Sequence, residues 1–164
     1  MHNKNSPKQL DMVIVGAGFS GLYMIHRAQQ SGLSVRCFEA GGGVGGTWYW
    51  NRYPGARVDI EFAEYSYSFS KELEQEWNWT ERYAAQPEIE RYANHVADRF
   101  DLRQRVDFNT RVESAIFNET SGLWTVTTDT GETLTTRYCI MATGLVSAPI
   151  EPRFLGREDF RGEQ

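Results

Sequence analysis

The residues with the clearest chemical pattern are the glycines of Gly16-Ala17-Gly18-Phe19-Ser20-Gly21, spaced as G-x-G-x-x-G. In such a loop the first glycine allows a tight turn, the second lets the backbone approach a pyrophosphate, and the third lets the next helix pack closely on a strand. The free N–H groups and the positive dipole end of that helix then face the phosphates. The spacing favours a dinucleotide site over a purely structural glycine turn.

Glu39 follows at the end of the next predicted strand, where a carboxylate can accept hydrogen bonds from a ribose 2′-hydroxyl. The same negative charge would repel a ribose 2′-phosphate, so it disfavours NADP at this loop. The glycines and Glu39 leave both FAD and NAD open. The alternative for Glu39 taken alone is a solvated charge at a strand end.

A second group of residues, from Gly45 to Asp59, combines a glycine pair, aromatic rings and fixed charges. The glycine pair lets backbone pass close to an extended ligand, and Trp48, Trp50 and Tyr53 can supply flat apolar walls. Taken singly, each ring is more often core packing and each arginine more often a weak surface ion pair. As one ordered string, the segment favours a ligand site.

These groups need elements that bring them together. Met12–Val15 is an apolar run typical of a buried parallel strand, and Phe19–Ser31 has the apolar stripe of a helix. Val35–Phe38 is a second short apolar strand. A strand, a helix and a strand at this spacing predict a βαβ unit. The glycine loop then lies between the first strand and the helix.

The rest of the chain predicts one further helix and a group of strands. Pro87–Phe100 has an apolar helical stripe with proline in its first turn, and the aromatic stretch Glu64–Tyr83 predicts short helical turns. Later segments rich in β-formers predict a β-meander over 106–109, 111–117, 123–128 and 133–141. We expect an α/β fold: a Rossmann-like βαβ unit with a parallel sheet, a helical and aromatic insertion, and an antiparallel β-meander.

The composition argues against several classes of protein. The formal net charge is −5, from 17 basic and 22 acidic residues, whereas nucleic-acid and anionic membrane surfaces need clustered Lys and Arg. The longest apolar stretch, 12–25, is interrupted by glycines and is too short to span a bilayer. The three histidines are too far apart in sequence to predict a metal site. With two cysteines and no secretory signal, we expect a cytoplasmic protein with free thiols.

A resemblance to a known family is carried by the string Gly45-Gly46-Thr47-Trp48-Tyr49-Trp50-Asn51-Arg52-Tyr53-Pro54-Gly55-Ala56-Arg57-Val58-Asp59. It closely resembles a segment of the class B flavoprotein monooxygenases, specifically the Baeyer–Villiger enzymes of the cyclohexanone and phenylacetone monooxygenase group. The resemblance continues through 60–61, 64–69, 76–83 and the Ala142-Thr143-Gly144 that ends the last strand. It therefore covers nearly the whole chain.

The resemblance implies that FAD lies on the first βαβ unit, with its phosphates at the glycine loop and its adenosine ribose at Glu39. Asp59 matches an acid that pairs with an active-site arginine, so it is the candidate catalytic residue. Arg57 and Val58 lie beside it, in the segment that faces the nicotinamide. The candidate cofactor-binding residues are Gly16, Gly18, Phe19, Ser20, Gly21, Glu39, Gly46, Thr47, Trp48, Tyr49, Trp50, Arg57, Val58, Asp59, Tyr65, Val112, Ala142, Thr143 and Gly144.

The chemistry implied by the resemblance is NADPH- and O2-dependent oxygenation of a small ketone. In the family, NADPH reduces the flavin, O2 adds to it as a C4a-peroxide, and attack on the ketone gives an ester or a lactone. Two other interpretations stay open. One is an N- or S-oxygenating flavin monooxygenase, which shares the glycine loop, and the other is a non-catalytic flavin-binding module.

The family fingerprint F-x-G-x-x-x-H-x-x-x-W begins at Phe160-Arg161-Gly162. We therefore expect a flexible arm over 1–10, an incomplete FAD-binding domain over 11–146, and the start of a linker to an NADPH domain over 147–164. The catalytic arginine would lie outside these residues. Such a chain would hold FAD without turnover, and its partner would be the remainder of the same enzyme chain.

Overall fold

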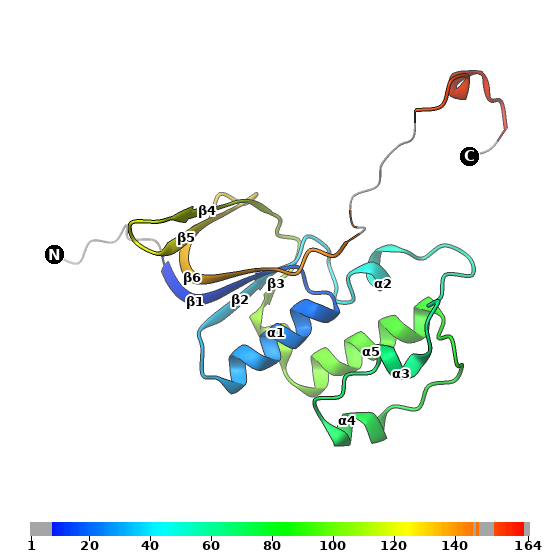
Figure 1. The fold of residues 1–164 in the computed structure, drawn as a ribbon, viewed down its shortest axis with the longest axis horizontal. Coiled ribbons are helices and arrows are strands. Elements are labelled where there is room, and N and C mark those ends of the chain that lie inside the picture. Colours follow the sequence, from blue (N-terminus) through cyan, green and yellow to red (C-terminus); the bar gives the residue numbers. More distant parts are fainter. Residues whose placement is uncertain (1–7, 146, 148–152, 163–164) are drawn as a thin grey trace.

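The computed structural model describes residues 8–145, 147 and 153–162, and strands of these residues form one sheet of order β3-β2-β1-β6-β5-β4 (Figure 1). β1 pairs in parallel with β2 and β6, β2 pairs in parallel with β3, and β4, β5 and β6 are antiparallel. The predicted combination of a parallel βαβ unit with an antiparallel meander is confirmed. The strands are β1 (Lys8–Val15), β2 (Val35–Phe38), β3 (Val106–Asp107), β4 (Val112–Asn118), β5 (Leu123–Thr128) and β6 (Thr133–Met141).

Two strand predictions need correction. The segment 106–109 was expected in the meander, but β3 pairs with β2 at the opposite edge of the sheet. β1 begins at Lys8 rather than Met12, because its first residues pair with β6, Lys8 opposite Leu134. Those hydrogen bonds are made by the backbone whatever the side chain. The end of the expected flexible arm thus belongs to the sheet, and residues 1–7 lie outside the described part.

Helices α1 (Phe19–Gln30) and α5 (Gln86–Arg99) lie on the same side of the sheet (Figure 1). Both follow the predicted helices to within one residue at each end. Short helices occupy the aromatic region between them: α2 (Thr47–Trp50), α3 (Phe62–Tyr65) and α4 (Lys71–Glu76). Two 3-10 turns, Leu102–Arg105 and Arg157–Asp159, complete the described helices.

The main core lies between the sheet and these helices. Met12 and Ile14 of β1 pack in one buried cluster with Leu22 and Ile25 of α1 and with Tyr92 of α5. Each side chain of this kind contributes about 1.5–3 kcal/mol when it is fully buried. The aromatic insertion covers the cluster with partly buried rings of Tyr67, Phe69, Trp77 and Trp79.

A second, smaller core lies on the other face of the sheet. It joins Val13 and Phe38 of the parallel strands to Val126 and Leu134 of the meander. Arg36 of β2 supports this arrangement with two ion pairs. Its guanidinium lies 2.9 Å from Asp107 of β3 and 2.5 Å from Glu132 in the turn before β6. The meander is therefore held to the parallel part of the sheet by both apolar packing and charge.

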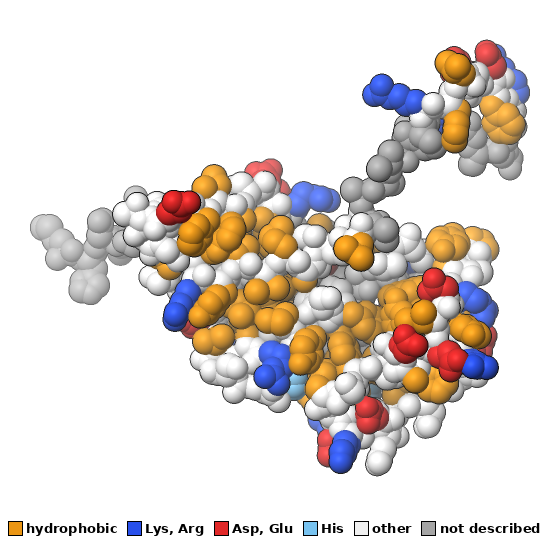
Figure 2. All heavy atoms as spheres, in the orientation of Figure 1, with side chains coloured by type: hydrophobic (Ala, Val, Ile, Leu, Met, Phe, Trp, Pro, Cys, Tyr) orange, Lys and Arg blue, Asp and Glu red, His pale blue; other side chains and the backbone are white. Residues whose placement is uncertain are grey.

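On the face shown in Figure 2, Lys and Arg side chains are scattered among acidic ones and form no single patch. Several arginines elsewhere in the described residues pair with carboxylates, among them Arg52 with Glu90 and Arg103 with Asp98. No described helix has the length and apolar content needed to cross a membrane.

Candidate functional site

The glycine loop joins β1 to α1 and leaves no room for side chains at two of its positions. Gly16 has φ +100°, and a Cβ there would lie 2.6 Å from the carbonyl oxygen of Ala142. A Cβ on Gly21 would lie 1.9 Å from the carbonyl oxygen of Gly16. The first glycine thus lets the loop pass under the end of β6, and the third lets α1 begin against the turn. This agrees with the roles predicted for them from spacing.

The N-terminus of α1 is open to a ligand. Its N-cap is Gly18, and no side chain of the described residues caps it. The first N–H groups of a helix have no partner inside the helix, so those of Phe19, Ser20 and Gly21 are available to an anion. A Cβ on Gly18 would lie 3.4 Å from the Cα of Gly46, and a Cβ on Gly46 would lie 2.9 Å from the Cα of Gly18. Two glycine backbones therefore face each other at this helix end.

Phe19 contributes its backbone to the loop while its ring faces the protein interior. The ring packs 5.4 Å from that of Tyr65 and 5.4 Å from that of Tyr67, centroid to centroid. The Tyr67 hydroxyl donates to the Phe19 carbonyl at 2.5 Å. Burial raises the pKa of Tyr67 well above its usual range, so this hydroxyl stays protonated and remains a donor. These contacts with Tyr65 and Tyr67 hold the first turn of α1 in place.

Glu39 lies directly after β2 and is buried, 5% exposed. Its carboxylate accepts two backbone hydrogen bonds at 2.7 Å, from the N–H of Ala17 to Oε2 and from the N–H of Gly41 to Oε1. Each carboxylate oxygen still has a lone pair available for a ribose hydroxyl. The alternative of a solvated strand-end charge does not hold, because Glu39 is an internal link between the glycine loop and the loop after β2.

The segment before β4 lies against the loop that follows β2. Thr110 N–H donates to the carbonyl oxygen of Glu39 at 2.9 Å, and Asn109 N–H donates to that of Gly41 at 3.0 Å. Asn109 has φ +53°, a conformation that Asn tolerates better than most residues. Val112 then begins β4. Val112 was among the predicted cofactor contacts, whereas Gly41 and Asn109 were not; the run of glycines over 41–43 was the available signal for Gly41.

Of Trp48, Trp50 and Tyr53, the three predicted flat walls, only Trp48 is buried. It is 8% exposed, and its indole N–H donates to the Tyr65 hydroxyl at 3.2 Å. Its carbonyl accepts a hydrogen bond from the Gln86 amide of α5 at 2.5 Å. Trp50 and Tyr53, in contrast, are 58% and 64% exposed. Of the three predicted flat walls, one is fixed by packing and two lie on the surface.

The charged residues of the aromatic segment have different surroundings. Arg52 pairs with Glu90 at 2.6 Å, and Arg57 pairs with Glu81 at 2.9 Å. Asp59 is exposed and has no ion pair or hydrogen bond from its side chain within the described residues. Both arginines are thus engaged with glutamates, whereas the carboxylate of Asp59 is accessible.

The remaining candidates lie around the two loops. Val58 is buried and its N–H donates to the Ala84 carbonyl at 3.1 Å, which holds the strand-like segment beside α5. Thr47 is exposed at the start of α2. After β6, Ala142 N–H donates to the Val15 carbonyl at 2.9 Å. Thr143 and Gly144 follow it, exposed, beside the glycine loop.

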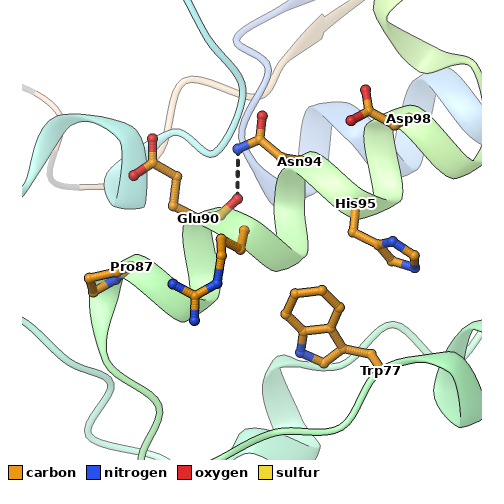
Figure 3. A pocket seen from close by; sticks show the side chains of 7 residues that line it. Trp77, Pro87, Glu90, Asn94, His95 and Asp98 are labelled. Carbon is orange, nitrogen blue, oxygen red and sulfur yellow. Dashed lines mark hydrogen bonds between the residues drawn. The ribbon is translucent and has the colours of Figure 1, made fainter.

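A groove of about 560 Å³ lies elsewhere, along the side of α5 (Figure 3). Trp77 faces this helix from the opposite wall, its ring 5.3 Å from that of His95. The indole nitrogen of Trp77 and Nε2 of His95 are buried without a hydrogen-bond partner in the described structure, although Nε2 lies 3.6 Å from a carboxylate oxygen of Glu76. No residue of the glycine loop lines this groove, so it is separate from the candidate dinucleotide site.

The structure therefore brings the glycine loop, Gly46, Glu39 and the segment after β6 together at the carboxyl ends of the parallel strands. Ligands of open α/β sheets bind at this edge. The residues fit a dinucleotide: an uncapped helix end for the phosphates and a buried carboxylate beside it for a ribose. Among the described residues, no cluster of His, Cys, Asp and Glu could hold a metal ion.

Comparison with known proteins gives a consistent result. A family model described as pyridine nucleotide-disulphide oxidoreductase matches residues 13–162. The chain is 48% identical over 162 residues to a Baeyer–Villiger monooxygenase of Pseudooceanicola batsensis, covering 98% of this chain and 30% of that protein. It is 44% identical over 160 residues to a phenazine N-monooxygenase of Lysobacter antibioticus, covering 97% and 30%.

A solved structure extends the similarity to three dimensions. The complex of OTEMO with FAD and NADP matches with a TM-score of 0.86 and 47% identity, over 97% of this chain and 30% of that one. The chain thus spans about 30% of the length of the relatives that it matches.

Proposed function

Since the chain belongs to the pyridine nucleotide-disulphide oxidoreductase family, and within it to the class B flavin monooxygenases of Baeyer–Villiger type, we propose that it forms the FAD-binding portion of an NADPH- and O2-dependent monooxygenase that converts ketones to esters or lactones. In this proposal residues 11–146 bind FAD and 147–164 begin a connection to an NADPH-binding domain. Residues 11–164 would bind FAD without turnover by themselves.

One observation carries the proposal: the backbones of Gly18 and Gly46 face each other at the open N-terminus of α1, with the buried carboxylate of Glu39 beside them. The helix end would bind the pyrophosphate through N–H groups, and Glu39 would accept from the adenosine ribose. A carboxylate in this place disfavours a 2′-phosphate, which supports FAD rather than NADPH at this loop. FAD would supply the redox chemistry, which side chains of this region do not provide.

The aromatic segment would position the cofactor rather than take part in the reaction. Trp48, in α2, is held through its indole N–H by Tyr65 and through its carbonyl by Gln86, so its ring and backbone have one defined place. We place the other cofactor contacts at the start of α2, at Val112 and in the segment 142–144. Asp59 would act as the acid that orients an active-site arginine, because its carboxylate is accessible and engaged with no other described residue.

The test is FAD binding by the purified protein and by its Gly18→Ala variant. The added Cβ makes only an ordinary contact with Gly46, at 3.4 Å, so folding should change little. The methyl group would, however, occupy space that the pyrophosphate needs. Crowding of this kind costs about 1–3 kcal/mol, so the Kd for FAD should rise about 5- to 150-fold.

Gln30→Ala, at the exposed far end of α1, is the matched control and should bind FAD like the wild type. The wild-type protein should be yellow and release FAD on denaturation. A folded protein that does not bind FAD, or a Gly18→Ala variant that binds it as tightly as the wild type, would contradict the proposed site.

A second candidate function, N-oxygenation, is favoured by the 44% identity to a phenazine N-monooxygenase. The FAD site would be the same, and the oxygen acceptor would be a ring nitrogen instead of a carbonyl carbon. Product analysis of the active enzyme with a ketone and with an aromatic N-heterocycle distinguishes the two. An ester or lactone supports the first function, and an N-oxide supports the second. If the protein forms neither product, the result supports a non-catalytic flavin-binding module.

A further inference from the structure

Tyr49 is enclosed by three consecutive glycines, Gly41–Gly43, which we call the glycine collar. A Cβ on Gly41 would lie 2.7 Å from Cε1 of the Tyr49 ring, and a Cβ on Gly43 would lie 2.8 Å from Cε2 on its other side. Between them, Gly42 N–H donates to the Tyr49 hydroxyl at 3.0 Å. The ring fits against this backbone only because none of the three residues has a side chain.

The glycine collar is also bound to the residue expected at the adenosine ribose. Gly41 N–H donates to Oε1 of Glu39, and the Gly41 carbonyl accepts from Asn109 N–H at 3.0 Å. The other oxygen of the same carboxylate holds the glycine loop at Ala17. Any displacement of the collar would therefore be passed directly to Glu39.

Tyr49 itself is held from the opposite side of the site. It belongs to α2, which begins next to Gly46, the residue that faces Gly18 at the open helix end. Arg52 lies over its ring at 5.1 Å and donates to its carbonyl at 2.8 Å, while pairing with Glu90 of α5. Tyr49 thus connects α2 to the loop that follows β2 through fixed contacts on both sides.

We propose that Tyr49 is a positioning residue for the adenylate half of the dinucleotide, acting through the glycine collar on Glu39 rather than by contact with the cofactor. This inference rests on the proposed FAD site and refines the expectation that Tyr49 contacts FAD. The hydroxyl accepts from Gly42, the two sides of the ring lie against Gly41 and Gly43, and Arg52 lies over the ring, so a structural role accounts for these contacts. The aromatic string and the glycine run would then act together to position Glu39.

The experiment compares FAD with FMN, which lacks the adenylate half, in titration calorimetry of the wild type and Tyr49→Phe. The variant keeps the ring and removes only the hydroxyl, and Gly42 is exposed enough for water to replace it, so the fold is retained. Losing one such hydrogen bond should weaken FAD binding by about two- to tenfold. FMN should bind both proteins equally well or neither of them.

Two further variants sharpen the result. Tyr53→Phe makes the same chemical change at an exposed tyrosine of the same segment and should leave FAD binding unchanged. Gly43→Ala displaces the Tyr49 ring without touching its hydroxyl and should weaken FAD binding at least as much as Tyr49→Phe.

The inference is overturned if Tyr49→Phe binds FAD like the wild type, or if FMN binding falls by the same factor as FAD binding. Equal loss in Tyr53→Phe would overturn it as well. A wild-type protein that binds no FAD would instead remove the proposed function, and the inference with it.

Discussion

Replacing Glu39 by glutamine should destabilise the protein even before any cofactor binds. The carboxylate accepts from Ala17 and Gly41 through different oxygens, each at 2.7 Å. A glutamine amide has one acceptor oxygen and one NH2 group, so it can serve only one of these N–H donors. The other backbone N–H would face a second donor in a buried place, since Ala17 is 0% exposed.

The magnitude follows from those two changes. A hydrogen bond to a charged group contributes about 1.5–3 kcal/mol, and a buried donor left without a partner costs about 1–3 kcal/mol. These terms overlap, so we expect the free energy of unfolding of Glu39→Gln to fall by about 2–4 kcal/mol. Urea denaturation of the protein without FAD measures this directly.

Glu64→Gln is the control, because Glu64 is exposed on α3 and the substitution removes the same charge. Its unfolding free energy should stay within about 0.5 kcal/mol of the wild type. If Glu39→Gln is also unchanged, Glu39 does not link the two loops as described. A loss of FAD affinity without loss of stability would assign Glu39 to ligand binding alone.

Two further predictions concern acid stability and catalysis. Burial, with a smaller contribution from Arg27, lowers the pKa of His26, so the unfolded chain takes up the proton first as the pH falls below 6.5. Neutral His26 is therefore compatible with folding above that pH, and its protonation opposes folding below it. Between pH 7.5 and 5.5 the wild type should lose more unfolding free energy than His26→Phe. Equal losses in urea titrations of the two proteins would refute this. Asp59→Ala should leave FAD affinity and stability unchanged, because Asp59 is exposed, but slow ketone oxygenation in the active enzyme by an order of magnitude or more. An unchanged rate in a product assay would remove Asp59 from the mechanism.

The sequence predicted the βαβ unit well because its signals are local. Val35–Phe38 forms β2 as expected, and α1 starts at Phe19, directly after the glycine loop. The prediction failed where tertiary pairing decides. The polar residues at the start of β1 show no apolar pattern, yet they pair with β6. The two residues of β3 have a β-forming sequence, but nothing in it indicates which strand they will join.

The geometry of the glycine loop could be predicted from the sequence, whereas the contacts that support the candidate site could not. The spacing of Gly16, Gly18 and Gly21 predicts a phosphate loop, and the clashes at two of these positions agree with it. The enclosure of Tyr49 by the glycine collar was not predictable. It depends on α2 folding back over the loop, which requires φ values of +124° at Gly45 and +57° at Gly46. Those angles follow from the whole fold, not from the string of aromatic residues.

Under the proposed function, the way the site is built would explain how one FAD-binding portion can serve different oxygenations. At the closest backbone approaches, Gly21 to Gly16 and Gly16 to Ala142, backbone meets backbone and side chains are excluded. Binding of the cofactor would then depend on a few glycines and Glu39, while exposed residues such as Trp50 and Asp59 could vary without loss of the nucleotide. Relatives named for Baeyer–Villiger oxidation and for N-oxygenation match this chain at 48% and 44% identity. Such similar values are expected if this region fixes the flavin and the choice of oxygen acceptor is made by residues that face the substrate.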